Sequence, residues 1–154
     1  MLKQFLNDLG TGSDAKMKFD HVTITVANMQ RSVEFYRDLL GLKVLGKLEN
    51  KEESSLFVYL DTGNGVLELF EFQKEGRPVE ASPNEDHGLK HIGFRVDSVD
   101  EVISRLRERD VKITLEPLDA NGGVRIAFFE DPDGVLLEVI EGDLQLDPYR
   151  DHGH

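Results

Sequence analysis

The fold is decided by residues 126–141, IAFFEDPDGVLLEVIE, which predict two strands joined by a tight turn. Pro132 presets its φ angle and Gly134 accepts a positive φ, so the residues between the strands suit a turn. The return strand, residues 135–140, is apolar except for Glu138. A carboxylate within an apolar strand is costly to bury unless it is paired or bound to a metal. Glu138 is therefore the first candidate for a functional side chain.

A second copy of this pattern lies 70 residues earlier in the chain, which predicts an internal duplication. Each copy carries one histidine near its start and one glutamate near its end: His21 and Glu68 in the first copy, His91 and Glu138 in the second. The matching segments are HVTITV (21–26) with HIGFRV (91–96), VLELFE (66–71) with LLEVIE (136–141), and Phe57 and Tyr59 with Ala127 and Phe129.

The composition excludes several classes of protein. With 154 residues, of which 39% are hydrophobic and 31% charged, the chain suits one globular domain or two small modules that share a core. The net charge of -12 argues against nucleic acids and anionic membranes as partners. No apolar run reaches the length of a membrane span, and the absence of cysteine excludes thiolate nucleophiles and thiolate metal ligands. We expect a protein without a signal peptide that resides in the cytoplasm.

Each copy predicts a β-α-β-β-β module, so the pattern indicates an α+β fold. The first module is expected over residues 19–75 and the second over 89–141, with a charged linker at 76–88. Residues 1–18 form an N-terminal extension with a short amphipathic helix that ends at Gly10, and residues 142–154 form an acidic tail. Helices are expected at 28–40, capped by Asn28, and at 98–109, opened by the capping box of Ser98 and Glu101. Strands are expected near 19–26, 42–48, 56–60, 66–72, 89–96, 112–115, 124–129 and 135–140.

Alternation along the first strand of each module places both histidines on the face opposite the aliphatic residues. His21 shares its face with two threonines, and His91 shares its face with Arg95. The aliphatic sets are Val22, Ile24 and Val26 in the first module, and Ile92, Phe94 and Val96 in the second. The first helix is expected to bury Val33, Tyr36, Leu39 and Leu40, and the second Val99, Val102, Ile103 and Leu106.

Two imidazoles and two carboxylates at a shared offset are typical of a site for a divalent cation. Nickel, cobalt, zinc, iron(II) and manganese all accept nitrogen and oxygen ligands of this kind. A single strand histidine is more often a structural hydrogen-bonding residue, and a single edge-strand glutamate is more often solvated. The repetition of both in each copy favours the metal site over these alternatives, with His21, Glu68, His91 and Glu138 as ligands.

Three segments resemble the vicinal-oxygen-chelate superfamily: HVTITVANMQRSVEFYRDLLGLKV (21–44), HIGFRVDSVDEV (91–102) and FFEDPDGVLLEVIE (128–141). The resemblance covers about residues 19–141. The superfamily includes glyoxalase I, methylmalonyl-CoA epimerase, fosfomycin-resistance enzymes, extradiol dioxygenases and metal-free bleomycin-binding proteins. The resemblance implies two paired βαβββ modules that form a curved, mostly antiparallel sheet around a metal site.

The ligand set His21, Glu68, His91 and Glu138 falls on the superfamily's four ligand positions and is most similar to that of glyoxalase I. The short chain resembles the bacterial type, which implies one nickel or cobalt ion per site, with zinc, manganese or iron also suitable. The implied activity is that of a metal-dependent lyase or isomerase acting on a small molecule. It transfers a proton next to a metal-bound carbonyl through an enediolate, with Glu138 or Glu68 as the base. A homodimer is expected, since glyoxalase I-like dimers build each site from both subunits.

The substrate stays open at the level of the sequence. Glyoxalase I commonly has an arginine that helps to hold glutathione where this chain has Thr25. Arg95 and Arg125 are the candidates for binding an anionic group of the substrate. Two alternatives remain: an epimerase of a CoA-linked or acidic substrate, similar to methylmalonyl-CoA epimerase, and a non-catalytic resistance protein that binds a small molecule.

Overall fold

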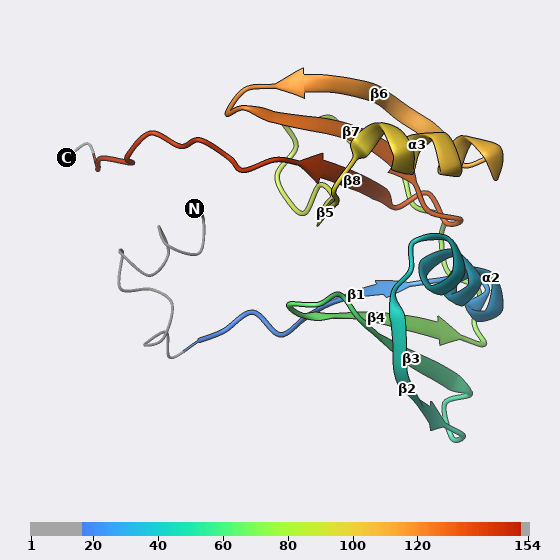
Figure 1. The fold of residues 1–154 in the computed structure, drawn as a ribbon. Helices are drawn as coiled ribbons and strands as arrows, with labels where there is room; N and C mark the ends of the chain where they lie inside the picture. Colours follow the sequence, from blue (N-terminus) through green and yellow to red (C-terminus); the bar gives the residue numbers. More distant parts are fainter. Residues whose placement is uncertain (1–16, 152–154) are drawn as a thin grey trace. The chain divides into compact units, whose positions relative to one another are not determined.

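The computed structural model describes residues 17–151. The helix expected before Gly10 lies outside these residues. The described chain forms two compact units, one made of residues 17–91 with 130–136 and the other of residues 92–129 with 137–151 (Figure 1). Each unit is built around its own four-stranded sheet.

The first sheet has the strand order β1-β4-β3-β2, with one parallel and two antiparallel pairings. Its strands are β1 (His21–Thr25), β2 (Lys43–Asn50), β3 (Ser55–Asp61) and β4 (Val66–Phe72). The second sheet repeats this order as β5-β8-β7-β6. Its strands are β5 (Ile92–Arg95), β6 (Ile113–Ala120), β7 (Val124–Glu130) and β8 (Leu136–Glu141). These two mixed sheets confirm the α+β class and the two βαβββ modules.

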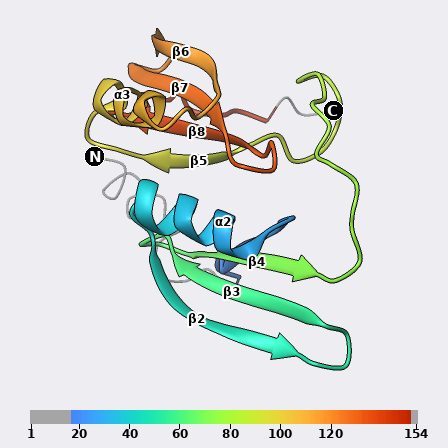
Figure 2. The same ribbon diagram turned by 90° about the vertical axis from the view of Figure 1, so that its right-hand side faces the viewer.

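Burial along β1 confirms the predicted alternation. Ile24 and Val26 are buried, whereas His21 and Thr23 on the opposite face are exposed. The helical segment after β1 packs on the buried face through contacts with β4 (Figure 2). In the second module His91, which directly precedes β5, and Gly93 and Arg95 within β5 are likewise exposed. Both candidate histidines therefore lie on the sheet face that the helices leave open.

The helical segment of the first module differs from the prediction in its winding. It begins as the α-helix α2 (Met29–Val33) and continues as the π-helix η1 (Glu34–Leu39). The Asn28 side chain accepts a hydrogen bond from the Arg31 backbone nitrogen at 2.9 Å, as expected for the cap. A π-turn adds one residue per turn. Across residues 34–39 this wider turn leaves Leu39 and Leu40 only partly buried. The fully buried residues of the segment are Met29, Ser32, Phe35 and Tyr36, and only Tyr36 is among the predicted ones.

The second module has a regular helix, α3 (Val99–Glu108), which buries Val99, Ile103 and Leu106 as predicted. Val102, also predicted to be buried, is only partly buried. The strand β6 is longer than the expected 112–115 because it continues through Pro117. Proline is tolerated at sheet edges and bulges. β6 is an edge strand, and its register shifts between Leu115 and Leu118.

The strands β4 and β8 each carry a second glutamate, which caps the helix of the same module. The carboxylate of Glu71 accepts a hydrogen bond from the Met29 backbone nitrogen at 2.5 Å, and that of Glu141 accepts one from Val99 at 2.9 Å. These are the first backbone N–H groups of α2 and α3, which have no partner within their helices. The two contacts are 70 residues apart at both ends, so the duplication extends to the joint between helix and sheet.

The turn Asp131–Gly134 packs with the first unit, although it lies within the second module in sequence. The Asp133 carboxylate accepts hydrogen bonds from the Ala27 backbone at 3.1 Å and from the Arg31 guanidinium at 2.9 Å. The Tyr36 hydroxyl donates to Asp131 at 2.7 Å. Burial, followed by the Asp131 charge and this hydrogen bond, raises the pKa of Tyr36 far above its ordinary value. Burial also raises the pKa of Asp131, an effect opposed by the Tyr36 hydrogen bond.

The sequence match of Phe57 and Tyr59 with Ala127 and Phe129 is wrong by one residue. The strands β3 and β7 have the same burial pattern when they are offset by 69, so Tyr59 corresponds to Phe128. The cause is the turn that follows. Thr62 bonds to the Gly65 carbonyl in the first module, whereas Asp131 bonds to the Val135 carbonyl in the second, which spans one residue more.

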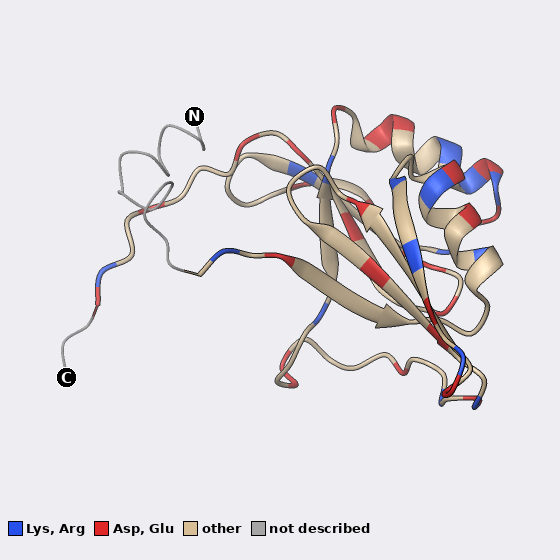
Figure 3. Ribbon diagram, turned by 90° about the horizontal axis from the view of Figure 1, so that it is seen from below, with Lys and Arg blue, Asp and Glu red and all other residues tan. Residues whose placement is uncertain are grey.

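The charge of the chain is dispersed over the described residues. Acidic residues occur on the strands, helices and loops rather than on a single element (Figure 3). In residues 17–151 no helix is both long and apolar enough to cross a membrane.

Candidate metal centre

The structure brings His21 and Glu68 together on the open face of the first sheet. Strands β1 and β4 are parallel, and their register pairs Thr23 with Glu68, two residues after His21. The Nε2 atom of His21 lies 3.7 Å from Oε2 of Glu68. Glu68 is only 8% exposed, a low value for a carboxylate on an open sheet face. A buried carboxylate requires a partner, and His21 faces it.

Asp20 fixes the orientation of His21. Its carboxylate accepts a hydrogen bond from Nδ1 of His21 at 2.6 Å. This bond, followed in effect by the charges of Glu68 and Asp20 and opposed by desolvation, raises the pKa of His21. With its proton on Nδ1, the neutral ring presents the Nε2 lone pair to Glu68. A carboxylate behind a histidine in this way is the usual support of a metal ligand.

The distance between Nε2 and the carboxylate fits a shared cation. At 3.7 Å the two atoms are too far apart for a good hydrogen bond. Typical metal–imidazole and metal–carboxylate distances sum to about 4.2 Å, so one cation can contact both atoms. Two lone pairs that face each other also require a positive charge between them, either a proton or a metal ion. The donor set of the first module therefore suits a divalent metal.

The second module holds the corresponding pair at β5 and β8. The register pairs Gly93 with Glu138, as it pairs Thr23 with Glu68 in the first sheet. A Cβ atom added to Gly93 would lie 3.3 Å from Oε2 of Glu138, so the absence of a side chain leaves room beside this carboxylate. His91 precedes Gly93 by two residues, the same spacing as between His21 and Thr23.

The surroundings of the two histidines differ. The residue before His91 is Lys90, where the first module has Asp20. The Lys90 ammonium donates to the Ser82 hydroxyl at 3.1 Å and to the Pro83 carbonyl at 2.8 Å. The carboxylate support of His21 therefore has no counterpart at this position of the second module.

The four candidate ligands form two pairs on two sheets. Within residues 17–151, no group of three or more histidine, aspartate or glutamate side chains converges on one point that could hold a metal ion. Each pair supplies one nitrogen and one oxygen, which is half of the predicted ligand set.

Aromatic side chains line the sheet face beside Glu68. Phe70 lies two residues after Glu68 on β4, and its ring centroid is 4.4 Å from that of Phe57 on β3. Phe72 continues the row with its centroid 5.8 Å from Phe70 and remains 42% exposed. Exposed aromatic rings beside a polar pair are typical of a ligand-binding surface. The duplicated positions in the second module, Ile140 and Gly142, carry no aromatic rings.

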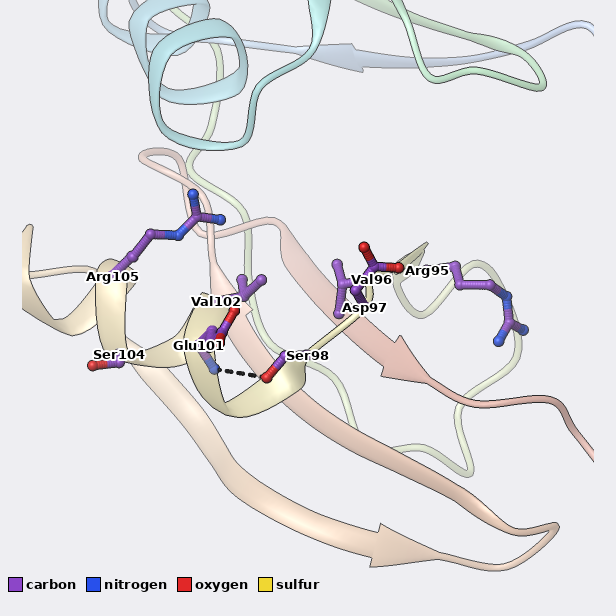
Figure 4. A pocket seen from close by; sticks show the side chains of 8 residues that line it. All are labelled: Arg95, Val96, Asp97, Ser98, Glu101, Val102, Ser104 and Arg105. Atoms are coloured by element: carbon purple, nitrogen blue, oxygen red, sulfur yellow. Dashed lines mark hydrogen bonds between the residues drawn. The ribbon is translucent and has the colours of Figure 1, made fainter.

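The two candidate arginines have different environments. Arg95 lines an open pocket of about 640 Å³ at the start of α3, together with Asp97, Glu101 and Arg105 (Figure 4). Arg95 and Arg105 lie toward opposite ends of this group, with Asp97 and Glu101 between them (Figure 4).

Arg125 is committed to carboxylates of the protein. It donates two hydrogen bonds to Asp100, at 2.7 and 3.0 Å, and one to Asp119 at 3.1 Å. These contacts join β7 to the first turn of α3, so the Arg125 guanidinium already has two carboxylate partners within the protein.

Comparison with known proteins identifies the family. A family model described as the Glyoxalase/Bleomycin resistance protein/Dioxygenase superfamily matches residues 18–139. The chain belongs to this superfamily. Members typically bind a divalent metal and generally act on small molecules.

The most similar superfamily members include enzymes and uncharacterised proteins at equal identity. A lactoylglutathione lyase of Salmonella typhimurium is 33% identical over 131 residues, which is 81% of this chain and 93% of that protein. An uncharacterised protein of Escherichia coli K12 is also 33% identical, over 79% of this chain and 93% of its own length. The chain covers only 36% of a probable chloroplastic lactoylglutathione lyase of Arabidopsis thaliana, at 32% identity.

Solved structures of the superfamily share the fold. A glyoxalase family protein of Enterococcus faecalis has a TM-score of 0.67 at 34% identity, covering 82% of this chain and 98% of its own. The trypanothione-dependent glyoxalase I of Leishmania major has a TM-score of 0.67 at 30% identity, covering 82% and 87% of the two chains. These neighbours confirm the predicted superfamily and its fold.

Sequence reasoning missed several residues that shape the site. The sequence pattern alone does not point to Asp20, although an acid directly before a candidate histidine is a usable signal for a supporting carboxylate. Glu71 and Glu141 match at the offset of 70, and their capping role could have been inferred from that match. Tyr59 was noticed only as part of the repeat, and its position opposite Glu68 depends on strand register.

Proposed function

We propose that the protein is a divalent-metal-dependent lyase or isomerase of the glyoxalase I type. It moves a proton between two adjacent carbons of a small substrate, one of them a carbonyl carbon, through an enediolate. The metal ligands are His21, Glu68, His91 and Glu138, and the metal is nickel or cobalt. When bound, the metal acts as a Lewis acid that stabilises the negative charge developing on the substrate oxygens.

The observation that carries this proposal is the geometry of His21 and Glu68. An imidazole nitrogen faces a carboxylate oxygen at 3.7 Å, and the imidazole is oriented from behind by Asp20. The same histidine and glutamate recur in the second module at the same spacing along the paired strands. A superfamily member without a metal would have no need to support this arrangement in the first module.

The two glutamates have different roles in the proposed reaction. Glu68 is enclosed and faces His21, so it serves as a fixed ligand. Glu138 lies beside Gly93, where the absence of a side chain gives its carboxylate room to move toward substrate. Glu138 takes the proton from one carbon and returns it to the neighbouring carbon. A positioned general base of this kind contributes roughly 10²–10⁴-fold to a rate.

The substrate has an apolar group and an anionic group. The apolar group fits beside the rings of Phe57, Phe70 and Phe72, which share the sheet face with Glu68. Arg95 shares its strand face with His91 and supplies a guanidinium for a carboxylate or phosphate. Thr25 stands where glyoxalase I commonly has an arginine, so glutathione is one candidate among several anionic carriers.

The direct test is the rate of thioester formation from the methylglyoxal–glutathione adduct. Metal-stripped protein is reloaded with nickel, cobalt or zinc, and bound metal is quantified in the same samples. We expect a rate that depends on metal and is highest with nickel or cobalt. Protein that holds its metal but neither forms the thioester nor exchanges a C–H of other α-hydroxycarbonyl compounds with deuterium would refute the proposed function.

We further propose that the site is completed in a homodimer, from the first module of one chain and the second module of its partner. His21→Ala and His91→Ala proteins should each be inactive. If the two variants are mixed in equal amounts and the dimers re-form, about half of the dimers contain one chain of each kind. One of the two sites in such a dimer has all four ligands, so about a quarter of wild-type activity should return. A site built within one chain would give no recovery, although each variant would still form dimers by size-exclusion chromatography.

A further inference from the structure

Tyr59 lies directly opposite Glu68 in the first sheet. The antiparallel register of β3 and β4 pairs the two residues, and β1 places Thr23 on the other side of Glu68. Directly paired residues project from the same face, with Cβ atoms about 5 Å apart. The side chain of Tyr59 therefore lies on the open face, beside the carboxylate that faces His21.

The tyrosine hydroxyl interacts with this carboxylate. Burial, followed by the charge of Glu68 and a hydrogen bond to it, raises the pKa of Tyr59. In this hydrogen bond the Tyr59 hydroxyl is the donor and the Glu68 carboxylate is the acceptor. Glu68 thus has His21 on one side and a hydroxyl donor from the neighbouring strand.

The second module lacks this hydroxyl. Phe128 corresponds to Tyr59 in the burial pattern of β7. The hydrogen bond between Asp131 and Val135 makes these two residues a pair at the turn between β7 and β8. Three residues further from the turn on each strand, Phe128 lies opposite Glu138. The same count from Thr62 and Gly65 reproduces the observed pairing of Tyr59 with Glu68. The hydroxyl is therefore a feature of one copy only and does not follow from the duplication.

We propose that Tyr59 is a positioning residue whose hydroxyl holds the Glu68 carboxylate beside His21 in the geometry that binds the metal. This inference rests on the proposed function, because it assumes that Glu68 is a metal ligand. A carboxylate that is oriented before the metal arrives loses less conformational freedom on binding. Removing a hydrogen-bond partner of a metal ligand typically lowers metal affinity or activity about 10–100-fold.

The test is the affinity for nickel of the Tyr59→Phe protein, measured by competition with a chromophoric chelator. The substitution keeps the ring and removes only the hydroxyl, so the sheet face is preserved. We expect the dissociation constant to rise about 10–100-fold. The matched control is Tyr36→Phe, which removes the hydroxyl that Tyr36 donates to Asp131 on the helix side of the sheet. It should lower the melting temperature without changing nickel affinity.

A double-mutant cycle shows whether the hydroxyl acts through Glu68. The Glu68→Gln protein should bind nickel too weakly to keep it through dialysis, so its affinity is measured by direct equilibrium titration at higher nickel concentrations. In this background the additional Tyr59→Phe substitution should change the affinity by no more than about twofold. An undiminished effect in that background would overturn the inference, as would wild-type affinity of Tyr59→Phe in the native background. If wild-type protein binds no nickel, both the inference and the proposed function fail. If wild type and Tyr59→Phe bind nickel equally well, only the inference fails.

Discussion

The two modules share their framework and differ around their candidate ligands. In both, a strand histidine lies two residues before the partner of a glutamate, and a second glutamate caps the helix. The neighbours of these ligands differ. The first module has Asp20, Thr23 and Tyr59 where the second has Lys90, Gly93 and Phe128.

This difference indicates a division of labour between the two copies. Asp20 orients His21, and Tyr59 lies opposite Glu68, so the first module is built to hold its pair in place. Gly93 leaves room beside Glu138, which suits a carboxylate that must move a proton. The shared fold requires only that both copies keep the same hydrophobic pattern, whereas the chemistry of the proposed reaction needs the two glutamates to differ.

The largest effect is expected for Glu138→Gln, which removes the proposed base. The amide keeps the shape of the side chain but cannot take up the proton, so the rate should fall roughly 10²–10⁴-fold. Steady-state rates with metal-saturated protein measure this loss. A residual rate close to that of wild type would break the comparison, because it would leave Glu138 without a distinct role.

Tyr36→Phe should destabilise the first unit by about 1–3 kcal/mol, since buried Asp131 would lose a hydrogen-bond donor. In the second module the residue at the position of Tyr36 is Leu106, which has no hydroxyl to donate to a carboxylate. The Tyr36 bond lowers the pKa of Asp131, so it stabilises the ionised carboxylate. The loss should be full at neutral pH and should shrink as the pH falls through the range above 3.8 in which Asp131 takes up a proton. Urea unfolding at several pH values measures it, and a pH-independent loss would contradict the role of this bond.

Phe128→Tyr would give the second module the hydroxyl of the first. A donor opposite Glu138 should restrain this carboxylate and slow proton transfer roughly tenfold, without weakening metal binding. The value of kcat with metal-saturated protein and the metal dissociation constant, measured separately, distinguish the two effects. A variant with unchanged kcat and intact metal content would argue that a hydroxyl at this position has no influence on the neighbouring glutamate.

The smallest effects are expected where the modules are alike. Glu71→Ala and Glu141→Ala each remove the acceptor for the first backbone N–H of a helix, so each should cost about 1 kcal/mol. Thermal melts of the two variants compare them directly. Similar losses of stability would show that the two glutamates cap their helices equally well. A loss confined to one variant would show that the two modules also differ in how the helix is attached to the sheet.

Most of the fold could be predicted because hydrophobic periodicity and the offset of 70 are local signals. They predict the eight strands and two helical segments of the described residues in the right order, with β6 too short, and they place His21 on the open face of its sheet. The π-helix was missed because a wider turn leaves no mark in a pattern read at 3.6 residues per turn. The one-residue slip at Tyr59 arose because the Asp131–Gly134 turn is longer than its counterpart.

The contacts that separate the two modules could not be predicted in the same way. The hydrogen bond between Tyr36 and Asp131 joins residues 95 positions apart. The pairing of Tyr59 with Glu68 depends on strand register, which a hydrophobic pattern alone does not specify when a face is partly polar. The ion pairs of Arg125 with Asp100 and Asp119 join residues that only the folded chain brings together.

The division of labour is tested most directly by the metal content of two variants, Glu68→Gln and Glu138→Gln, after loading with nickel and dialysis. The wild-type protein should retain about one ion per chain, because each site needs one pair from each module. We predict that Glu138→Gln retains most of this nickel and that Glu68→Gln loses it. Equal retention by the two variants, or greater loss from Glu138→Gln, would contradict the account.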